Sequence, residues 1–283
     1  MVFDALGAEF PLSFCPTGMV PQKSGSPFVP ISAEEIVIQV REVADLGITS
    51  VHLHARDDQG RPVWEKSYFA DIIRGIRETN PELVICVTTS GRIEPAVDRR
   101  ADVLELSGDD APDMASLTLS SMNFAEEASV NSPFTVKVLA QKMLDRGIKP
   151  ELEVFDLGML NYVKYLAGKG LLQPPFVVNL ILGGVASAQA TLSDMGALVG
   201  NLPPSSVWLA GGIGKAQLPA NSLSLASGGG VRVGLEDNIY FDSARTRLAS
   251  NLELVRRVTE LGEILGRSPM APRAFRKEFL SEK

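Results

Sequence analysis

The sequence of 283 residues contains only two cysteines, Cys15 and Cys86, and only two histidines, His52 and His54. Two cysteines are too few for a disulfide scaffold, so we expect a reducing, intracellular compartment. The longest apolar runs, such as PPFVVNLILGGVA at 174–186, are shorter than the roughly 20 residues that cross a bilayer. The segment 1–14 lacks a basic stretch followed by an apolar one, which predicts no secretory signal. We therefore expect a cytoplasmic protein without a membrane span.

The chain also has fewer basic than acidic residues. The chain has 27 Lys and Arg against 34 Asp and Glu, which gives a formal net charge of −7, and no basic run is visible. An acidic chain without a basic patch is not expected to bind nucleic acid. With 45% hydrophobic and 22% charged residues, the composition is that of a globular enzyme-sized protein with ample material for a core.

Short apolar runs alternate with longer amphipathic runs along the whole chain. The apolar runs predict eight strands, at 11–16, 48–55, 81–89, 114–119, 150–156, 175–182, 205–211 and 231–237. The amphipathic runs predict eight helices, at 31–47, 64–80, 94–106, 132–147, 158–170, 187–202, 215–230 and 243–266. The first helix carries its own start signal, because Ser32 followed by Glu35 forms a capping-box pattern.

This alternation predicts a parallel sheet covered by helices, because the strands are near-continuous apolar runs. Eight strand–helix units in a chain of this length fit a closed (β/α)8 (TIM) barrel better than an open doubly wound sheet, although periodicity alone allows both. No linker or repeat indicates a second domain. We predict one α/β barrel domain over 1–283, with an extended loop at 17–30 and a charged C-terminal tail.

The two histidines occupy alternate positions of the second predicted strand. Residues two apart on a strand point to the same face, so His52, His54 and Arg56 are expected inside the barrel while Val51 and Leu53 face the helices. Two imidazoles near the C-terminal end of a barrel strand can share one metal ion. The alternative is a pair of hydrogen-bonded core histidines, and the pair alone does not decide between them.

The last predicted strand supplies a third candidate ligand. Arg232 and Glu236 share one parity in VRVGLED, and the first strand separates this strand from the histidine strand in a closed barrel. Two histidines and a glutamate with open positions are typical of a catalytic zinc site. Asp237 follows directly and is a candidate base, or else it forms an Arg–Asp pair that only shapes the loop. Glu151, Glu153 and Asp156 are further candidates, and we expect Glu153 to hold an arginine or histidine.

Seven segments resemble the β-keto acid cleavage enzymes, whose members include the 3-keto-5-aminohexanoate cleavage enzyme. They are PTG (16–18), VHLHARD (51–57), TTSG (88–91), DMASLTLSSMNF (113–124), GIKPELEVFD (147–156), GGIGKAQLP (211–219) and VRVGLEDNIY (231–240). The resemblance implies a (β/α)8 barrel, a homo-oligomer (a dimer or tetramer), and a Zn²⁺ or another divalent ion. It implies that a β-keto acid and acetyl-CoA give acetoacetate and a new acyl-CoA.

The resemblance also implies roles for individual residues. His52, His54 and Glu236 correspond to the metal ligands, Asp237 to the base, and Arg232 to the group that orients this base. The expected contacts to the substrate carboxylate and keto end come from Thr88, Thr89, Ser90, Gly91 and Ser116. A family member that acts on an amino-substituted keto acid has a glutamate where this chain has Val20. Because an unpaired buried ammonium is costly, we predict a neutral or apolar β-keto acid.

Two other functions stay open at this stage. A metal-dependent keto acid lyase or aldolase that does not use CoA would need the same metal ligands. A barrel that has lost its activity and serves as a binding protein is the other alternative, against which the joint presence of His52, His54, Arg232, Glu236 and Asp237 argues.

Overall fold

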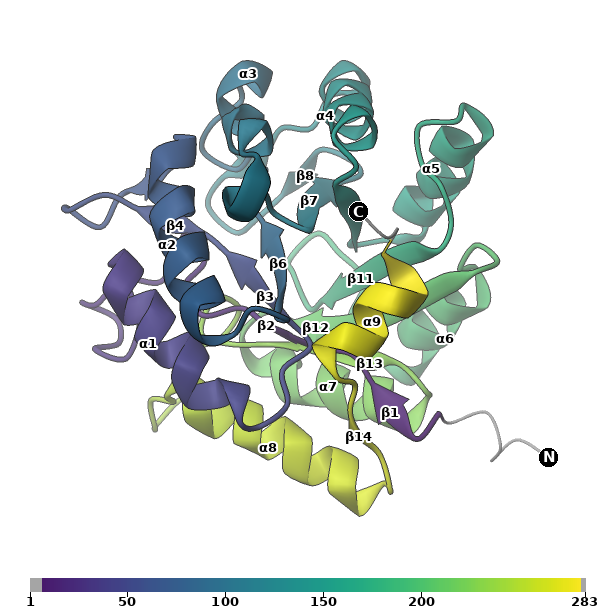
Figure 1. Ribbon diagram of the computed structural model, residues 1–283. Helices are drawn as coiled ribbons and strands as arrows, with labels where there is room; N and C mark the ends of the chain where they lie inside the picture. The colour runs from purple at the N-terminus through teal and green to yellow at the C-terminus, as the bar shows by residue number, and fades with distance from the viewer. Residues whose placement is uncertain (1–6, 281–283) are drawn as a thin grey trace.

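A computed structural model describes residues 7–280, and its centre is a closed barrel of parallel strands surrounded by helices (Figure 1). Going round the barrel in chain order, the strands are β2 (Leu12–Phe14), β3 (Ser50–Leu53), β6 (Val84–Val87), β7 (Met114–Thr118), β10 (Lys149–Val154), β11 (Phe176–Leu182), β12 (Ser206–Gly212) and β13 (Gly230–Val233). The predicted (β/α)8 barrel is confirmed, and the open sheet is excluded because β13 pairs with β2.

Each strand of the barrel is followed by a helix, and these helices surround the barrel. These helices are α1 (Ala33–Ala44), α2 (Lys66–Thr79), α3 (Val97–Arg100), α4 (Pro133–Asp145), α5 (Leu157–Gly168), α6 (Leu192–Gly200), α7 (Gln217–Ala226) and α8 (Asn251–Ile264). The outward side chains Val51 and Leu53 of β3 are fully buried beneath this layer, as their parity predicts. At α1 the predicted capping box between Ser32 and Glu35 is present. None of the helices within residues 7–280 is long and apolar enough to span a bilayer.

Three small strand pairs and three 3-10 turns complete the described chain. The pairs are β1 (Glu9–Phe10) with β14 (Ser268–Pro269), β4 (Ala55–Arg56) with β5 (Pro62–Val63), and β8 (Met122–Asn123) with β9 (Ala128–Ser129). The 3-10 turns are η2 (Asp102–Glu105), η3 (Gly108–Asp110) and η4 (Gly214–Ala216). All of them lie outside the barrel wall, where they shape its two ends.

Several predicted elements differ from the structure, and the charged tail is ordered. The strand expected over 231–237 ends at Val233, so Glu236 and Asp237 lie in the segment that follows it. The helix expected over 187–202 begins only at Leu192. The helix expected over 94–106 is a short α3 followed by η2. The helix expected from residue 243 begins only at Asn251, because the side chain of Ser250 accepts from the backbone of Glu253 and caps it there. Most of the tail forms β14 and α9 (Pro272–Phe279). Residues 1–6 and 281–283 of the predicted domain lie outside the described residues.

Helix α9 closes the N-terminal end of the barrel, across which it lies in Figure 1. Its Phe275 is 2% exposed and packs among the first residues of several barrel strands, including Val84 and Met114. Arg276 fixes the helix by donating to both carboxylate oxygens of Asp113 at 2.7 and 2.6 Å. Since this end is sealed by side chains, access to the barrel interior is from the opposite, C-terminal end.

We expect Phe275→Ala to lower the free energy of unfolding by about 3 kcal/mol, because it removes a buried aromatic ring and leaves a cavity. Denaturant titration would measure the loss. Phe134→Ala is the matched control, because Phe134 is 69% exposed. It should change the stability by no more than about 0.5 kcal/mol. If both substitutions changed the free energy of unfolding equally, α9 would not be part of the cooperatively folded core.

Candidate functional site

His52, His54 and Glu236 converge at the C-terminal end of the barrel. The Nε2 atom of His54 lies 3.1 Å from Oε1 of Glu236, and Nε2 of His52 lies 4.0 Å from the same oxygen. Both histidines are at least 95% buried, His52 at 1% and His54 at 5% exposure. His52 lies on β3, His54 directly follows that strand, and Glu236 lies in the segment after β13; β13 and β3 both pair with β2. Closure of the barrel thus brings His54 and Glu236 into contact although they are 182 positions apart in the sequence.

A glycine in the loop after β2 allows Glu236 to reach this position. Gly18 has a φ of 68°, in the left-handed region, and a Cβ added there would lie 2.5 Å from Cγ of Glu236. Any larger residue would therefore be strained in its backbone and would also push the glutamate away from the histidines. Arg56, which we expected inside the barrel, instead donates to the carbonyl oxygens of Gly18 and Pro21 and holds this loop.

The three side chains fit a bound divalent ion. Ligand atoms of a tetrahedral zinc at its usual bond lengths are about 3.4 Å apart, and the donor atoms of this group all lie within 4.8 Å of one another. The second carboxylate oxygen of Glu236, Oε2, is buried and has no hydrogen-bond partner among the described residues. A buried anionic oxygen is costly unless it is paired or bound to a cation. The geometry and this orphaned oxygen therefore both indicate a cation site.

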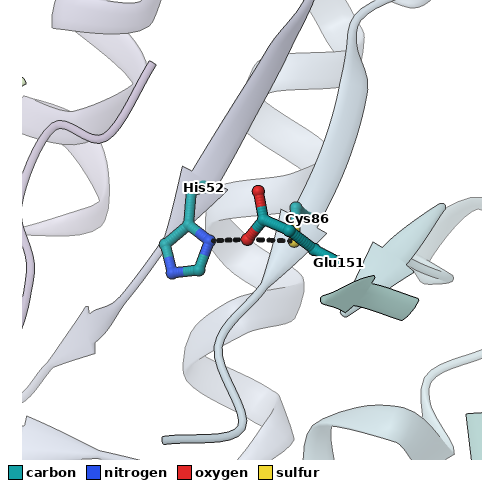
Figure 2. Close-up of side chains that lie close together, drawn as sticks. All are labelled: His52, Cys86 and Glu151. Carbon is teal, nitrogen blue, oxygen red and sulfur yellow. Dashed lines mark hydrogen bonds and ion pairs between the residues drawn. The ribbon is translucent and has the colours of Figure 1, made fainter. Parts of the chain in front are cut away.

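Glu151 on β10 fixes the orientation of His52. Its Oε2 lies 2.8 Å from Nδ1 of His52 and accepts from Sγ of Cys86 at 3.5 Å, and Figure 2 shows these contacts. Its other oxygen accepts from Asn179 at 3.2 Å. With Nδ1 bonded to the glutamate, Nε2 is the nitrogen that faces Glu236. Burial alone would lower the pKa of His52, but Glu236 and Glu151 outweigh it and raise the pKa to about 9.

His52, Cys86 and Glu151 are also close enough to hold a metal ion, but their bonding argues against it. Burial, with the negative charges of Glu151 and Glu153, raises the pKa of the Cys86 thiol well above its usual value, so the sulfur keeps its proton. Metal binding requires the thiolate. Oε2 of Glu151 is moreover hydrogen-bonded to both His52 and Cys86. These residues therefore hold His52 in place for the His52–His54–Glu236 site.

Arg232 lies fully buried between Glu236 and Asp237. Its Nη2 donates to Glu236 at 2.7 Å, and its Nε donates to Asp237 at 2.8 Å. The third nitrogen, Nη1, is buried and has no partner among the described residues. Burial and the neighbouring Glu236 raise the pKa of Asp237 against the opposing effect of Arg232. The site therefore contains one free buried donor beside a carboxylate that is a better base than an exposed aspartate.

The expectation that Glu153 holds a histidine or an arginine is wrong, because Glu151 does so. Glu153 accepts from the hydroxyl of Thr118 at 2.5 Å. The two glutamates share a parity on β10, and only the strand register decides which of them reaches His52. Asp156, the third candidate, caps α5 by accepting from the backbone of Met159.

A cavity of about 530 Å³ opens over these residues at the C-terminal end of the barrel. His54, Arg232, Glu236 and Asp237 line it. Of the predicted substrate contacts, Val20, Thr88 and Ser90 also line the cavity. The other three, Thr89, Gly91 and Ser116, do not.

Thr89, Gly91 and Ser116 lie behind the wall, where they hold its shape. Thr89 donates through its hydroxyl to the backbone of Ser116, and its backbone N–H donates to the Ser116 hydroxyl. Gly91 leaves room for Arg100, since a Cβ there would lie 2.4 Å from Nη1 of that arginine. This arrangement therefore does not favour the prediction that these three residues contact the substrate directly.

The sequence did not predict several residues that line the cavity. Arg92 directly follows the TTSG segment, and its guanidinium lies 4.0 Å above the ring of Phe124 and pairs with Glu127. Lys215 and Arg245 line the opposite part of the cavity. The position of Arg92 after a predicted strand end was an available signal. Arg245 lies in a segment that we predicted as helix, so the sequence pattern concealed it.

The family model described as beta-keto acid cleavage enzyme matches residues 11–280. The chain belongs to this family. Among curated β-keto acid cleavage relatives, a 3-keto-5-aminohexanoate cleavage enzyme of Fusobacterium nucleatum is 36% identical over 88% of this chain and 90% of its own. A 3-oxoadipate:acetyl-CoA acetyltransferase of Cupriavidus necator is 35% identical over 90% of this chain and 89% of its own.

Solved structures agree on the fold. The apo structure of ObcA superimposes with a TM-score of 0.80 at 21% identity, covering 90% of this chain and 66% of that chain. Similarity at this level of identity establishes the barrel and nothing about the reaction. In this β-keto acid cleavage enzyme, the assignment of the metal site therefore rests on the residues and their geometry.

We expect Glu151→Gln to weaken metal affinity about 10- to 100-fold, because a ligating imidazole loses the carboxylate that orients it. Competition with a chromophoric chelator would measure the affinity. Glu153→Gln is the matched control, since Glu153 is similarly buried on the same strand but contacts Thr118. If both variants bind metal as tightly as the unaltered protein, the orienting role of Glu151 is wrong.

Proposed function

We propose that this chain catalyses a metal-dependent cleavage of a β-keto acid with acetyl-CoA. In this reaction the acetyl group joins the α-carbon of the keto acid, and CoA joins the remaining acyl fragment, so that the products are acetoacetate and a new acyl-CoA. The observation that carries the proposal is the convergence of His52, His54 and Glu236 with the Arg232–Asp237 pair in one cavity. Family membership and three relatives with acetyl-CoA in their names support it.

His52, His54 and Glu236 are the proposed ligands of Zn²⁺ or another divalent cation. When bound, the ion supplies Lewis acidity toward the keto oxygen of the substrate. Nitrogen and carboxylate donors with the remaining positions open suit zinc in a catalytic role. Glu151 contributes by holding the His52 ring in the orientation that ligation requires.

Asp237 is the proposed base that removes the proton from the α-carbon of the keto acid. Arg232 holds both oxygens of this carboxylate, through Nε at 2.8 Å and Nη2 at 3.3 Å, so it fixes the direction in which the base points. Its partner-free Nη1 is available to donate to an oxygen that gains negative charge. The burial of the pair excludes bulk water and strengthens both interactions.

The proposed substrate is a neutral or apolar β-keto acid. Thr88 and Ser90 offer hydroxyl groups to its carboxylate at one wall of the cavity. Val20 lies in the lining where an amino substituent would need an anionic partner. An uncharged side chain at this position disfavours an ammonium group on the substrate.

We further propose that the chain works as one domain in a cytoplasmic homo-oligomer, either a dimer or a tetramer. This proposal rests on the family to which the chain belongs. Light scattering in solution would measure the oligomeric state.

We expect Asp237→Asn to retain stoichiometric metal while its turnover with a β-keto acid and acetyl-CoA falls about 10²- to 10⁴-fold, because an amide cannot accept the proton. His52→Ala should lose both metal and turnover. Metal analysis together with acetoacetate formation would measure both properties. An Asp237→Asn enzyme with full turnover would exclude this aspartate as the base.

The same assay without acetyl-CoA distinguishes the proposed reaction from that of a CoA-independent lyase. Acetoacetate and a new acyl-CoA must appear in equal amounts and only when acetyl-CoA is present. Cleavage of the keto acid at an unchanged rate without the thioester would favour the lyase. Failure to bind any divalent ion would favour a binding protein.

We expect Val20→Glu to increase the relative kcat/KM for 3-keto-5-aminohexanoate over a straight-chain β-keto acid about tenfold, because the new carboxylate can pair with the ammonium. Val20→Gln is the matched control, being similar in size but uncharged. Competition between the two substrates would give the ratio directly. If the unaltered enzyme already cleaves the amino substrate as fast as the best straight-chain acid, the proposed specificity is wrong.

A further inference from the structure

Two cationic side chains without an ionic partner lie at one side of the cavity. Lys215 belongs to η4, which follows β12, and Arg245 belongs to the loop between β13 and α8. Both are exposed and both line the cavity. The other arginines of the lining are neutralised, Arg232 by Glu236 and Asp237 and Arg92 by Glu127. Within residues 7–280, Lys215 and Arg245 form no ion pair, and we call them the rim cations.

The backbone brings the rim cations together. A Cβ added to Gly214 would lie 2.7 Å from Nη2 of Arg245, so this guanidinium lies directly over the residue that precedes Lys215. Arg245 has a φ of 58°, which is uncommon for a residue other than glycine. The carboxylate of Asp242, three residues before Arg245, is occupied by Thr246 and by the backbone of Arg247. The Arg245 guanidinium is therefore held beside the backbone that carries Lys215, and neither cation has an ionic partner within residues 7–280.

The rim cations are linked to the catalytic end of the cavity by a short path. The backbone N–H of Gly214 donates to the carbonyl oxygen of Asp237 at 2.7 Å. Ile213 and Ile239 line the cavity along the same two segments. A ligand with an anionic end on the rim cations and an uncharged arm along these residues would point its far end toward Asp237.

Phosphate is the anion that this arrangement suits best. Lysine binds it as a compact charge and arginine as a planar fork of donors. The loops after the seventh and eighth strands of such barrels frequently form phosphate sites, and β12 and β13 are these strands here. Thr88 and Ser90, the proposed contacts of the keto acid carboxylate, lie on the other side of the barrel after the third strand. The rim cations are thus left for a second, multiply charged ligand.

We propose that Lys215 and Arg245 bind the phosphate groups of the CoA thioester and so direct its acyl end toward Asp237. This inference rests on the proposed function, which supplies the ligand class. The solvated position of both cations matches the phosphates, which stay hydrated, while the apolar walls match the uncharged pantetheine arm.

The test compares two thioesters in steady-state kinetics. Acetyl-CoA carries the phosphates, and acetyl-pantetheine carries the same thioester without them. Lys215→Gln and Arg245→Gln should each raise KM for acetyl-CoA about tenfold, and the double variant should raise it further. In all three variants, kcat and the KM for the keto acid should stay unchanged. Both kinetic constants for acetyl-pantetheine should stay unchanged. Lys215→Arg should restore most of the affinity, and added salt should narrow the difference.

Matched controls are Lys164→Gln on α5 and Arg256→Gln on α8, which remove equally exposed cations outside the cavity lining. They should leave KM for acetyl-CoA unchanged. The proposal is overturned if the double variant keeps the KM of the unaltered enzyme, or if KM rises equally for both thioesters.

A binding measurement separates this inference from the proposed function. Adenosine 3′,5′-bisphosphate, which lacks the thioester, should bind the unaltered protein in calorimetry and should bind the double variant at least tenfold more weakly. If no β-keto acid is cleaved with acetyl-CoA, the proposed function fails, whereas this calorimetric difference still supports a phosphate site. If cleavage occurs but the bisphosphate binds both proteins equally, only the role of the rim cations fails.

Discussion

Closure of the barrel through β2 is the constraint on which the site depends. Because β2 pairs with β13 on one side and with β3 on the other, Glu236 meets His52 and His54 although the chain separates them widely. Gly18 in the loop after β2 then determines how near the glutamate comes, since no side chain fits between the loop and Glu236. An open sheet of the same strands would leave β13 and β3 at positions that cannot share a ligand.

The charge balance at the bottom of the cavity explains why this arrangement calls for a cation. Four carboxyl groups, those of Glu151, Glu153, Glu236 and Asp237, lie near one buried guanidinium, that of Arg232, so acidic groups are in excess here. Buried charges are tolerated when they are paired or bind metal. A divalent ion between the histidines and Glu236 would neutralise the excess negative charge. Oε2 of Glu236, which has no hydrogen-bond partner among the described residues, is the oxygen that could bind it.

In the proposed reaction the cavity above this group holds two ligands. The hydroxyl groups after the third strand would bind the keto acid carboxylate, and the rim cations after the seventh and eighth strands would bind the phosphates. Asp237 belongs to the floor between them, tied to Arg232 by its side chain and to Gly214 by its backbone. A reaction between two substrates needs such an arrangement, because each must be held separately while their reacting carbons meet.

The sequence alone determined the order of the eight strand–helix units, the inward positions of His52 and His54, and the pairing of Arg232 with Asp237, because alternation and short spacings are local properties of the chain. The helix that seals the barrel base was decided only by tertiary structure. The same holds for the choice of Glu151 over Glu153, and for the approach of Arg245 to Gly214. In each of these cases the deciding contact joins segments that are distant in sequence, and strand register or loop packing sets it, which no local pattern encodes.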